Sequence, residues 1–180
     1  MNATECIKSR RSIREFTAEP ISHEVLDEIV SVAAYAPSWK NTQISRYVVV
    51  EGALKDSISE SCFSSFPGNG VIVSKAAALV VVTYVKNRSG FERDGSFSTN
   101  KEDRWQNFDT GLASEAFVLA AHERGIGSVI LGYFDEEKVS KAISLPDNLG
   151  VSVLIAIGHP AVNPEAPKRK EVADLVSYLS

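Results

Sequence analysis

The sequence predicts a three-layer sandwich, in which one β-sheet lies between two layers of helices. The strand-like segments are continuous apolar runs, such as ALVVVTYV at residues 78–85, and a strand without alternation is covered on both faces. The segments between these runs carry apolar residues at helical spacing, so helices can supply both covers. This pattern fits both an α+β and an α/β arrangement of the strands.

Four helices are predicted, and most carry a start or stop signal. They cover residues 22–36, 53–65, 109–125 and 134–146. Ser22 is a candidate N-cap of the first helix, and Pro37 ends it because the residue before a proline avoids the helical region. Asp109 can cap the third helix, and Gly125 fits the left-handed position after its last turn. Asp135 is the expected cap of the fourth.

The predicted strands are short apolar segments that alternate with these helices. They cover residues 46–52, 78–85, 127–132 and 151–158. Residues 86–103 are polar and contain glycine, so we expect a mobile surface loop there. A loop of this length inside a domain is more often functional or disordered than a simple connection.

The composition limits the classes of function that the chain can have. Its 180 residues carry a net charge of −4, which argues against a nucleic-acid-binding protein. Cys6 and Cys62 are too few and too far apart for a disulfide framework or a zinc site. The N-terminal residues lack the apolar stretch of a secretory signal, and no apolar run has the length of a membrane span. We therefore expect a cytoplasmic protein that binds neither nucleic acid nor membranes.

The basic residues gather in two short segments of this acidic chain. The first places four cations around a hydroxyl group: Lys8, Arg10, Arg11 and Arg14 around Ser12. The second is KRK at residues 168–170. Such clusters are either solvated faces or the site of a small anionic ligand. The segment GIGSVILG does not identify a dinucleotide site, because it follows a helix and enters a strand, the reverse of the required order.

Four motifs occur in a fixed order along nearly the whole chain. They are RRSIR at 10–14, PSWKNTQ at 37–43, DTGLASEAFVLAAHERGIGSVILGYF at 109–134, and IGHP at 157–160 followed by PKRK. In this order and spacing, the sequence resembles the nitroreductase family of FMN-dependent oxidoreductases. The resemblance implies an α+β fold with a central mixed sheet flanked by helices. It also implies one domain over residues 1–180, with an arm at about 160–180 that packs on the partner subunit.

The resemblance assigns the basic residues to the FMN phosphate. Arg10, Arg11 and Ser12 would hold it, and Lys168, Arg169 or Lys170 would close on it from the C-terminal segment. A phosphomonoester carries nearly two negative charges at neutral pH, and arginine forks suit its oxygens. Arg14 would lie near flavin N1 and the C2 carbonyl, where a cation stabilises the reduced ring.

Further positions are assigned to the flavin ring by the same resemblance. Asn69 would bond its edge, although PGNG can also be a plain turn. Backbone of the third strand's end would lie beside the ring and donate toward N5, at Ile130, Leu131 and Gly132. Three residues would reach the cofactor from the partner subunit of a homodimer: Pro37, Ser38 and Asn41. Family members commonly follow the glutamine with Pro-Trp, whereas here Gln43 precedes Ile44, so the anchoring of this loop is open.

The implied activity needs no catalytic acid or base from the chain. Hydride would pass from NADH or NADPH to FMN and then to a nitroaromatic, a quinone or a flavin, in a ping-pong order. Four aromatic residues are candidates to cover this small aromatic acceptor: Trp39, Phe91, Phe97 and Trp105. Two alternatives stay open. One is a family relative with specialised chemistry, such as dehalogenation, dehydrogenation or flavin fragmentation, and the other is an FMN-storing or FMN-sensing protein.

Overall fold

The computed structural model describes residues 1–179. Its helices are α1 (Ala3–Ser9), α2 (His23–Ala33), α3 (Gly52–Ser61), α4 (Pro67–Lys75), α5 (Arg104–Glu123) and α6 (Glu136–Ala142). Its strands are β1 (Ser45–Val50), β2 (Ala78–Val85), β3 (Gly127–Leu131) and β4 (Leu149–Gly158). Two 3-10 turns, η1 (Trp39–Asn41) and η2 (Val172–Asp174), complete the elements. No helix within residues 1–179 has the length and hydropathy to cross a membrane.

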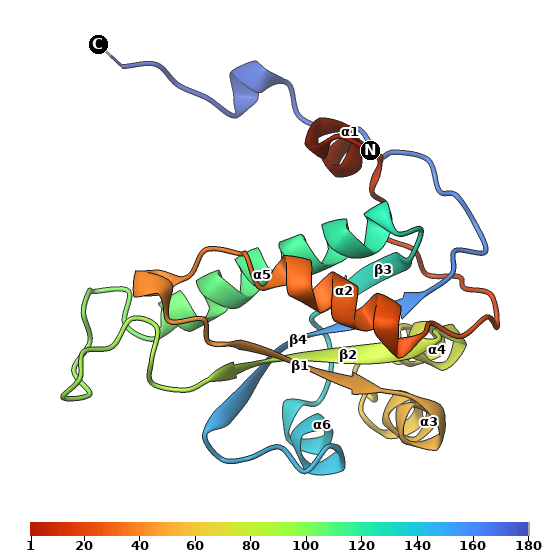
Figure 1. The fold of residues 1–180 in the computed structure, drawn as a ribbon, viewed down its shortest axis with the longest axis horizontal. Helices are drawn as coiled ribbons and strands as arrows, with labels where there is room; N and C mark the ends of the chain where they lie inside the picture. The colour runs from red at the N-terminus through yellow and green to blue at the C-terminus, as the bar shows by residue number, and fades with distance from the viewer. Residues whose placement is uncertain (180) are drawn as a thin grey trace.

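The four strands form one sheet in the order β1-β2-β4-β3 (Figure 1). All three neighbouring pairs are antiparallel, with Val81 opposite both Val48 and Leu154. The resemblance implied a mixed sheet. The structure contradicts this, because every neighbouring pair of strands is antiparallel. Within residues 1–179 the parallel pairing is a single isolated bridge between Ser12 and Ser128, too short to count as a strand. Helices on an antiparallel sheet confirm the α+β class.

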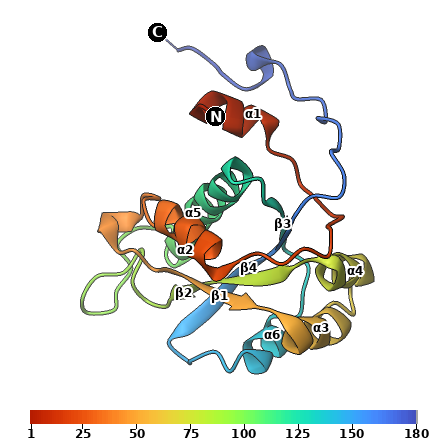
Figure 2. The ribbon, with the colours of Figure 1, turned by 45° about the vertical axis from the view of Figure 1, so that its right-hand side comes forward.

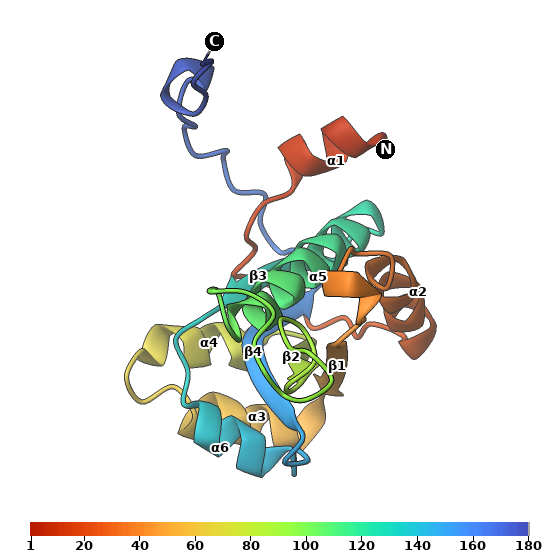
Figure 3. The ribbon, with the colours of Figure 1, turned by 90° about the vertical axis from the view of Figure 1, so that its left-hand side faces the viewer.

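Helices cover both faces of the sheet, as the apolar runs predict. Helices α2 and α5 lie on one face, and α3, α4 and α6 lie on the other (Figure 3). In β2, Val80 and Val82 join the core under α2 and α5, whereas Leu79 and Val81 join the opposite core. All four side chains are fully buried. Alternate residues of one continuous apolar strand thus build two separate cores.

The predicted N-caps Ser22 and Asp135 and the glycine after α5 are confirmed, but α2, α3 and α6 end earlier than predicted and α5 begins earlier. The Ser22 side chain accepts from the Val25 amide and that of Asp135 from the Lys138 amide, so both cap helices as expected. Gly125 has a φ of 75° after α5. Helix α5 itself begins at Arg104, so Asp109 is not its cap but lies inside it, almost fully buried. The first turn is fixed by Trp105, whose ring packs 4.6 Å from that of Trp39.

Helix α4 occupies a segment whose residues suggest a turn. Pro67 stands in its first turn, where the missing amide costs nothing. Gly70 packs against the backbone of α3 so closely that an added Cβ would lie 2.5 Å from the Ser59 carbonyl oxygen. The glycine therefore serves close helix packing, and PGNG opens a helix that carries Asn69 in its buried side.

Both ends of the chain extend beyond the body of the molecule (Figures 1 and 2). Helix α1 touches α5 through Cys6, which is 8% exposed, and through the Ser9 hydroxyl, which lies 2.8 Å from His122 Nε2. After β4 the chain runs out as an arm, in which Leu175 is 68% and Leu179 97% exposed. Ser180, the last residue of the predicted arm, lies outside the described residues. These two leucines of the arm therefore present apolar surface to solvent in the protomer.

Candidate functional site

The N-terminal basic segment is held in an extended conformation beside β3. Arg10 ends α1, and its φ of −56° and ψ of 136° turn the chain out of the helix. Two residues later the chain meets β3 at the bridge between Ser12 and Ser128, where the Ile13 amide donates to the Ser128 carbonyl at 2.9 Å. Ile13 is buried and anchors the segment. The side chains of Ser12 and its basic neighbours therefore gather along one edge of the sheet.

A cleft of about 310 Å³ opens at this edge, and we call it the basic cleft. Its lining is Arg10, Arg11, Ser12, Arg14, Pro164, Glu165, Pro167 and Arg169. The structure thus brings residues from both basic segments to one place. Arg14 and Arg169, for example, lie 155 positions apart in the sequence but line the same cleft. Lys168 and Lys170 are exposed and are not part of the lining.

The four arginines of the basic cleft outnumber the one carboxylate in its lining, that of Glu165. None of them pairs with a carboxylate within 4.0 Å in residues 1–179. Arg11 donates only to backbone carbonyls, those of Lys8 and Arg10, both at 2.8 Å. The Nε of Arg10 is buried without a hydrogen-bond partner. Uncompensated guanidinium groups beside a hydroxyl are the donor set that a phosphate group requires.

The electrostatic field of these arginines reaches a nearby histidine. His122 lies in α5, and its Nε2 is 2.8 Å from the Ser9 hydroxyl. Burial lowers the pKa of His122, and the charges of Arg10 and Arg11 lower it further. The two guanidinium groups thus add to the effect of burial in disfavouring a charged His122.

A smaller cavity of about 140 Å³ adjoins the basic cleft. Its lining is Arg10, Ser12, Arg14, Glu115, Val118, Ser128, Val129 and Ile130. Ile130 is 43% exposed although it lies in a strand that is otherwise buried, and Leu131 is 4% exposed. Arginines on one side and the apolar Ile130 on the other suit a flat ring that bears a phosphate tail. The residues present therefore fit FMN.

Asn69 and Gly132 lie close together beyond β3, but outside both of these cavities. Asn69 is buried, and its Nδ2 donates to the carbonyl of Tyr133 at 3.1 Å. Tyr133 directly follows Gly132. The amide thus fixes the end of β3, although neither residue belongs to the lining of the basic cleft or of the smaller cavity.

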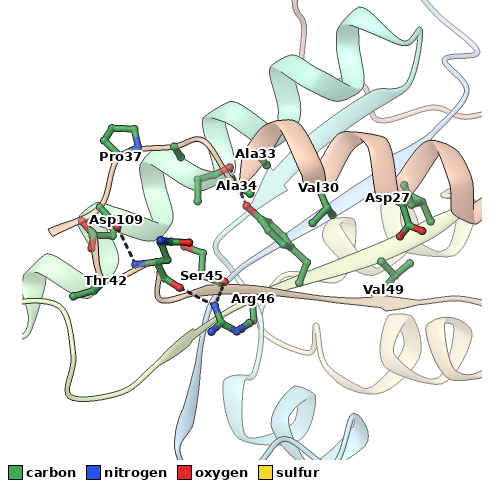
Figure 4. Close-up of a pocket in the computed structure, with 16 residues that line it drawn as sticks. Asp27, Val30, Ala33, Ala34, Pro37, Thr42, Ser45, Arg46, Val49 and Asp109 are labelled. Atoms are coloured by element: carbon green, nitrogen blue, oxygen red, sulfur yellow. Dashed lines mark hydrogen bonds between the residues drawn. The ribbon is translucent and has the colours of Figure 1, made fainter. Parts of the chain in front are cut away.

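The loop 37–41 lies elsewhere, beside a larger cavity between α2, β1 and α5 (Figure 4). This large cavity measures about 610 Å³, and Pro37 and Ser38 belong to its lining, whereas Asn41 does not. Its walls are mostly apolar. The Arg46 guanidinium is already used in hydrogen bonds within the chain, since it donates to the carbonyls of Gln43 and Ser45 at 2.7 Å each.

A buried carboxylate anchors this loop, which settles the question that the missing Pro-Trp leaves open. The Trp39 amide donates to both carboxylate oxygens of Asp109, at 3.1 and 2.9 Å. The Gln43 amide donates to the Ser38 hydroxyl at 2.9 Å, and Ile44 is buried behind it. Sequence reasoning missed this role because it treated Asp109 as a helix cap. No local pattern could have shown it, because its donors Trp39 and Ser89 lie far away in the sequence.

Comparison with known proteins identifies the family. The sequence model described as the Nitroreductase family matches residues 7–71 and 68–159. The chain belongs to the nitroreductase family. The resemblance predicted from its motifs is confirmed.

Several relatives within the nitroreductase family align over most of the chain. A protein of Archaeoglobus fulgidus named as an NADH dehydrogenase/NAD(P)H nitroreductase is 32% identical, over 87% of this chain and 86% of its own length. The NADPH-flavin oxidoreductase of Vibrio harveyi is 28% identical, over 93% of this chain and 70% of its own. A nitroreductase structure from Desulfovibrio desulfuricans in complex with FMN matches with a TM-score of 0.80 at 27% identity, covering 100% of this chain and 98% of that one.

In this nitroreductase-family chain, two groups of predicted cofactor residues, the basic segment and the loop 37–41, lie at opposite ends of α5. Next to the basic segment, Ser9 contacts His122 in the last turns of α5. The loop 37–41 contacts Asp109 in the second turn of the same helix. One protomer therefore does not bring the two groups together.

Proposed function

We propose that this protein is an FMN-dependent oxidoreductase, which passes hydride from NADH or NADPH to a small aromatic acceptor. The observation that carries the proposal is the convergence of four uncompensated arginines and Ser12 beside the exposed Ile130. The names of relatives support it, since they include an NADPH-flavin oxidoreductase and an NAD(P)H nitroreductase.

The chain's own residues would bind and tune the cofactor. Arg10, Arg11 and Ser12 would hold the phosphate, and Arg169 would close on it from the arm. Arg14 would place a fixed positive charge beside the flavin, which favours its reduction. The bound FMN would supply the hydride chemistry, and the apolar Ile130 and the end of β3 would support the ring. Nicotinamide and acceptor would occupy the same place in turn, which is a ping-pong order.

We also propose a homodimer of single-domain subunits, each spanning residues 1–180. The two groups of cofactor residues at opposite ends of α5 support this, because two subunits can bring together what one keeps apart. The exposed leucines of the arm support packing of residues 160–180 on the partner. Cys6 and Cys62 are free and buried, which suits a reducing cytoplasm.

The acceptor class is proposed from the aromatic residues next to the loop 37–41. Phe97 is 49% exposed, and its ring lies 4.9 Å from that of Phe91. Trp39 packs on Trp105 at the base of the same loop 86–103. Exposed aromatic rings offer stacking surfaces to a flat acceptor such as a nitroaromatic, a quinone or a flavin.

Anaerobic mixing of the purified protein with NADH or NADPH tests this function. We expect a yellow protein that bleaches rapidly, and whose colour returns when a quinone is added. Slow bleaching with tight retention of FMN would point to a storage or sensing protein instead. Reduction only by a particular organic substrate would indicate specialised chemistry. A colourless protein that does not bind added FMN at micromolar concentration would contradict the proposal altogether.

A further inference from the structure

Asp109 joins two loops that are far apart in the sequence. Its side chain is buried, with the whole residue 2% exposed. Both carboxylate oxygens accept from the Trp39 amide of the loop 37–41, at 3.1 and 2.9 Å. Oδ2 also accepts from the hydroxyl of Ser89 in the loop 86–103, at 2.7 Å. Ser89 is itself fully buried. One carboxylate thus holds the backbone of the first loop and a side chain of the second.

Other contacts tie the same two loops together. The Lys40 ammonium lies 2.9 Å from Glu92, and that carboxylate also accepts from the Ser98 hydroxyl at 2.6 Å. Trp105 of α5 contacts both loops, since its ring packs 4.6 Å from that of Trp39 and its Nε1 donates to the Thr99 hydroxyl of the loop 86–103 at 2.8 Å. The loop 86–103 is therefore joined to the loop 37–41 both directly and through α5.

The physical cost of this junction indicates a positioning role. No cation pairs with Asp109 within 4.0 Å in residues 1–179, so hydrogen bonds alone stabilise its position. A buried acceptor that loses a donor is expensive to leave unsatisfied. Movement of either loop away from Asp109 would leave the carboxylate short of a partner. The position of one loop therefore affects the free energy of the other.

We propose that Asp109 is a positioning residue that couples the acceptor-side loop 86–103 to the flavin-side loop 37–41. The inference rests on the proposed function, in which the first loop covers the acceptor and the second reaches the FMN of the partner subunit. An acceptor that displaces the loop 86–103 then changes the fit of the loop 37–41 against the flavin. Asp109 contacts neither molecule and acts through Trp39 and Ser89.

A matched pair of serine variants in the full-length protein tests the coupling. Ser89→Ala removes the hydroxyl that reaches Asp109, whereas Ser114→Ala removes an equally buried hydroxyl that bonds only within α5, to the Thr110 carbonyl at 2.7 Å. Amide hydrogen exchange of residues 37–43 gives a readout independent of activity. The kinetic readout is the KM and kcat for 1,4-naphthoquinone with NADH or NADPH.

Ser89→Ala should accelerate exchange in residues 37–43 by about tenfold, although the change lies in the other loop, because one hydrogen bond to a charged group is lost. It should raise the KM for 1,4-naphthoquinone by about five- to tenfold with little change in kcat. Ser114→Ala should leave both quantities unchanged. If Ser89→Ala does not fold, Ser89→Cys, which keeps a weaker donor of similar size, should give the same changes at a smaller size.

The outcomes separate this inference from the proposed function. Equal exchange of residues 37–43 and equal KM in the two serine variants would overturn the coupling. Faster exchange in Ser89→Ala without any change in KM would overturn its role in acceptor binding. A wild-type protein that binds no FMN would contradict the proposed function, and the exchange measurement would still test the junction at Asp109.

Discussion

The basic cleft and the large cavity hold their charged groups in opposite ways. The basic cleft is the smaller, at about 310 Å³ against 610 Å³, and its four arginines pair with no carboxylate in residues 1–179. At the large cavity, the buried Asp109 accepts hydrogen bonds from two loops, whereas Arg46, like Arg11 of the basic cleft, donates to two nearby backbone carbonyls. The Asp109 carboxylate is thus already used in holding the fold together, although Thr42 Oγ1 in the lining of the large cavity is buried without a partner.

This difference indicates where an anionic cofactor binds. A site for a ligand keeps unsatisfied charge that the ligand neutralises, whereas a structural network satisfies its own. Both volumes fall within the usual range for small-molecule sites, and size alone would favour the large cavity. The balance of donors and acceptors favours the basic cleft instead.

The assignment of FMN to the basic cleft would fail most clearly if arginines from the two regions contributed equally to FMN binding. The double variant Arg10→Ala and Ser12→Ala should weaken FMN binding by at least about 100-fold, because it removes charge-assisted bonds to the phosphate. Arg46→Ala, at the large cavity, should change it by less than about twofold. Titration of the apoprotein with FMN, followed by flavin fluorescence, measures both. An effect of Arg46→Ala as large as that of the double variant would contradict the assignment.

Single substitutions in the C-terminal segment test which of its cations contributes to FMN binding. Arg169 belongs to the lining of the basic cleft, but Lys168 and Lys170 do not. Arg169→Ala should weaken FMN binding by about tenfold, and either lysine variant by clearly less. The same titration ranks the three. A lysine variant with the greater loss would mean that the arm changes its register when the subunits associate.

The sequence predicted the sandwich well because its signals are local. An apolar run such as residues 78–85 specifies burial on both faces, and the caps at Ser22 and Asp135 depend on neighbours three residues away. Prediction from the sequence failed where a contact between distant residues determines the local structure. The first turn of α5 packs on Trp39, which lies 66 positions before Trp105, and α4 packs closely against α3 at Gly70.

At the candidate site, too, local patterns predicted some features, whereas features that depend on distant contacts were missed. Counting cations predicted that the segments at 8–14 and 168–170 could share an anion, and the structure brings Arg14 and Arg169 to one cleft. Which of the three C-terminal cations lines the cleft depends on the path of the arm, which no local pattern specifies. The role of Asp109 was hidden for a related reason, because its donors lie 70 and 20 positions away.

His122 provides a finer measure of the field in the basic cleft. Burial and the charges of Arg10 and Arg11 lower its pKa below the usual 6.5, so the folded state loses stability as the pH falls below that value. Bound FMN should raise this pKa by neutralising the arginines, and Arg10→Ala should raise it without FMN. NMR titration of the imidazole measures the shift. His23, whose pKa is raised by its hydrogen bond with Glu51, should not respond to FMN.

The smallest expected effect lies in the exposed contact between the two loops. The hydrogen bond from Ser98, followed by the interaction with Lys40, lowers the pKa of Glu92 below 4.5. A lowered acid pKa contributes stability above 4.5 that is lost as the pH falls through the folded value. Glu92→Gln should therefore accelerate hydrogen exchange in residues 86–103 at neutral pH, by at most about fivefold because the pair is exposed.

That difference between Glu92→Gln and the wild type should vanish in acid and shrink in 1 M salt, since protonation and screening both remove the attraction to Lys40. The junction at Asp109 is buried, so the acceleration caused by Ser89→Ala should persist in salt. If salt abolished both effects equally, the two loops would be joined at their exposed surface alone, and the buried carboxylate would have no separate part in holding them.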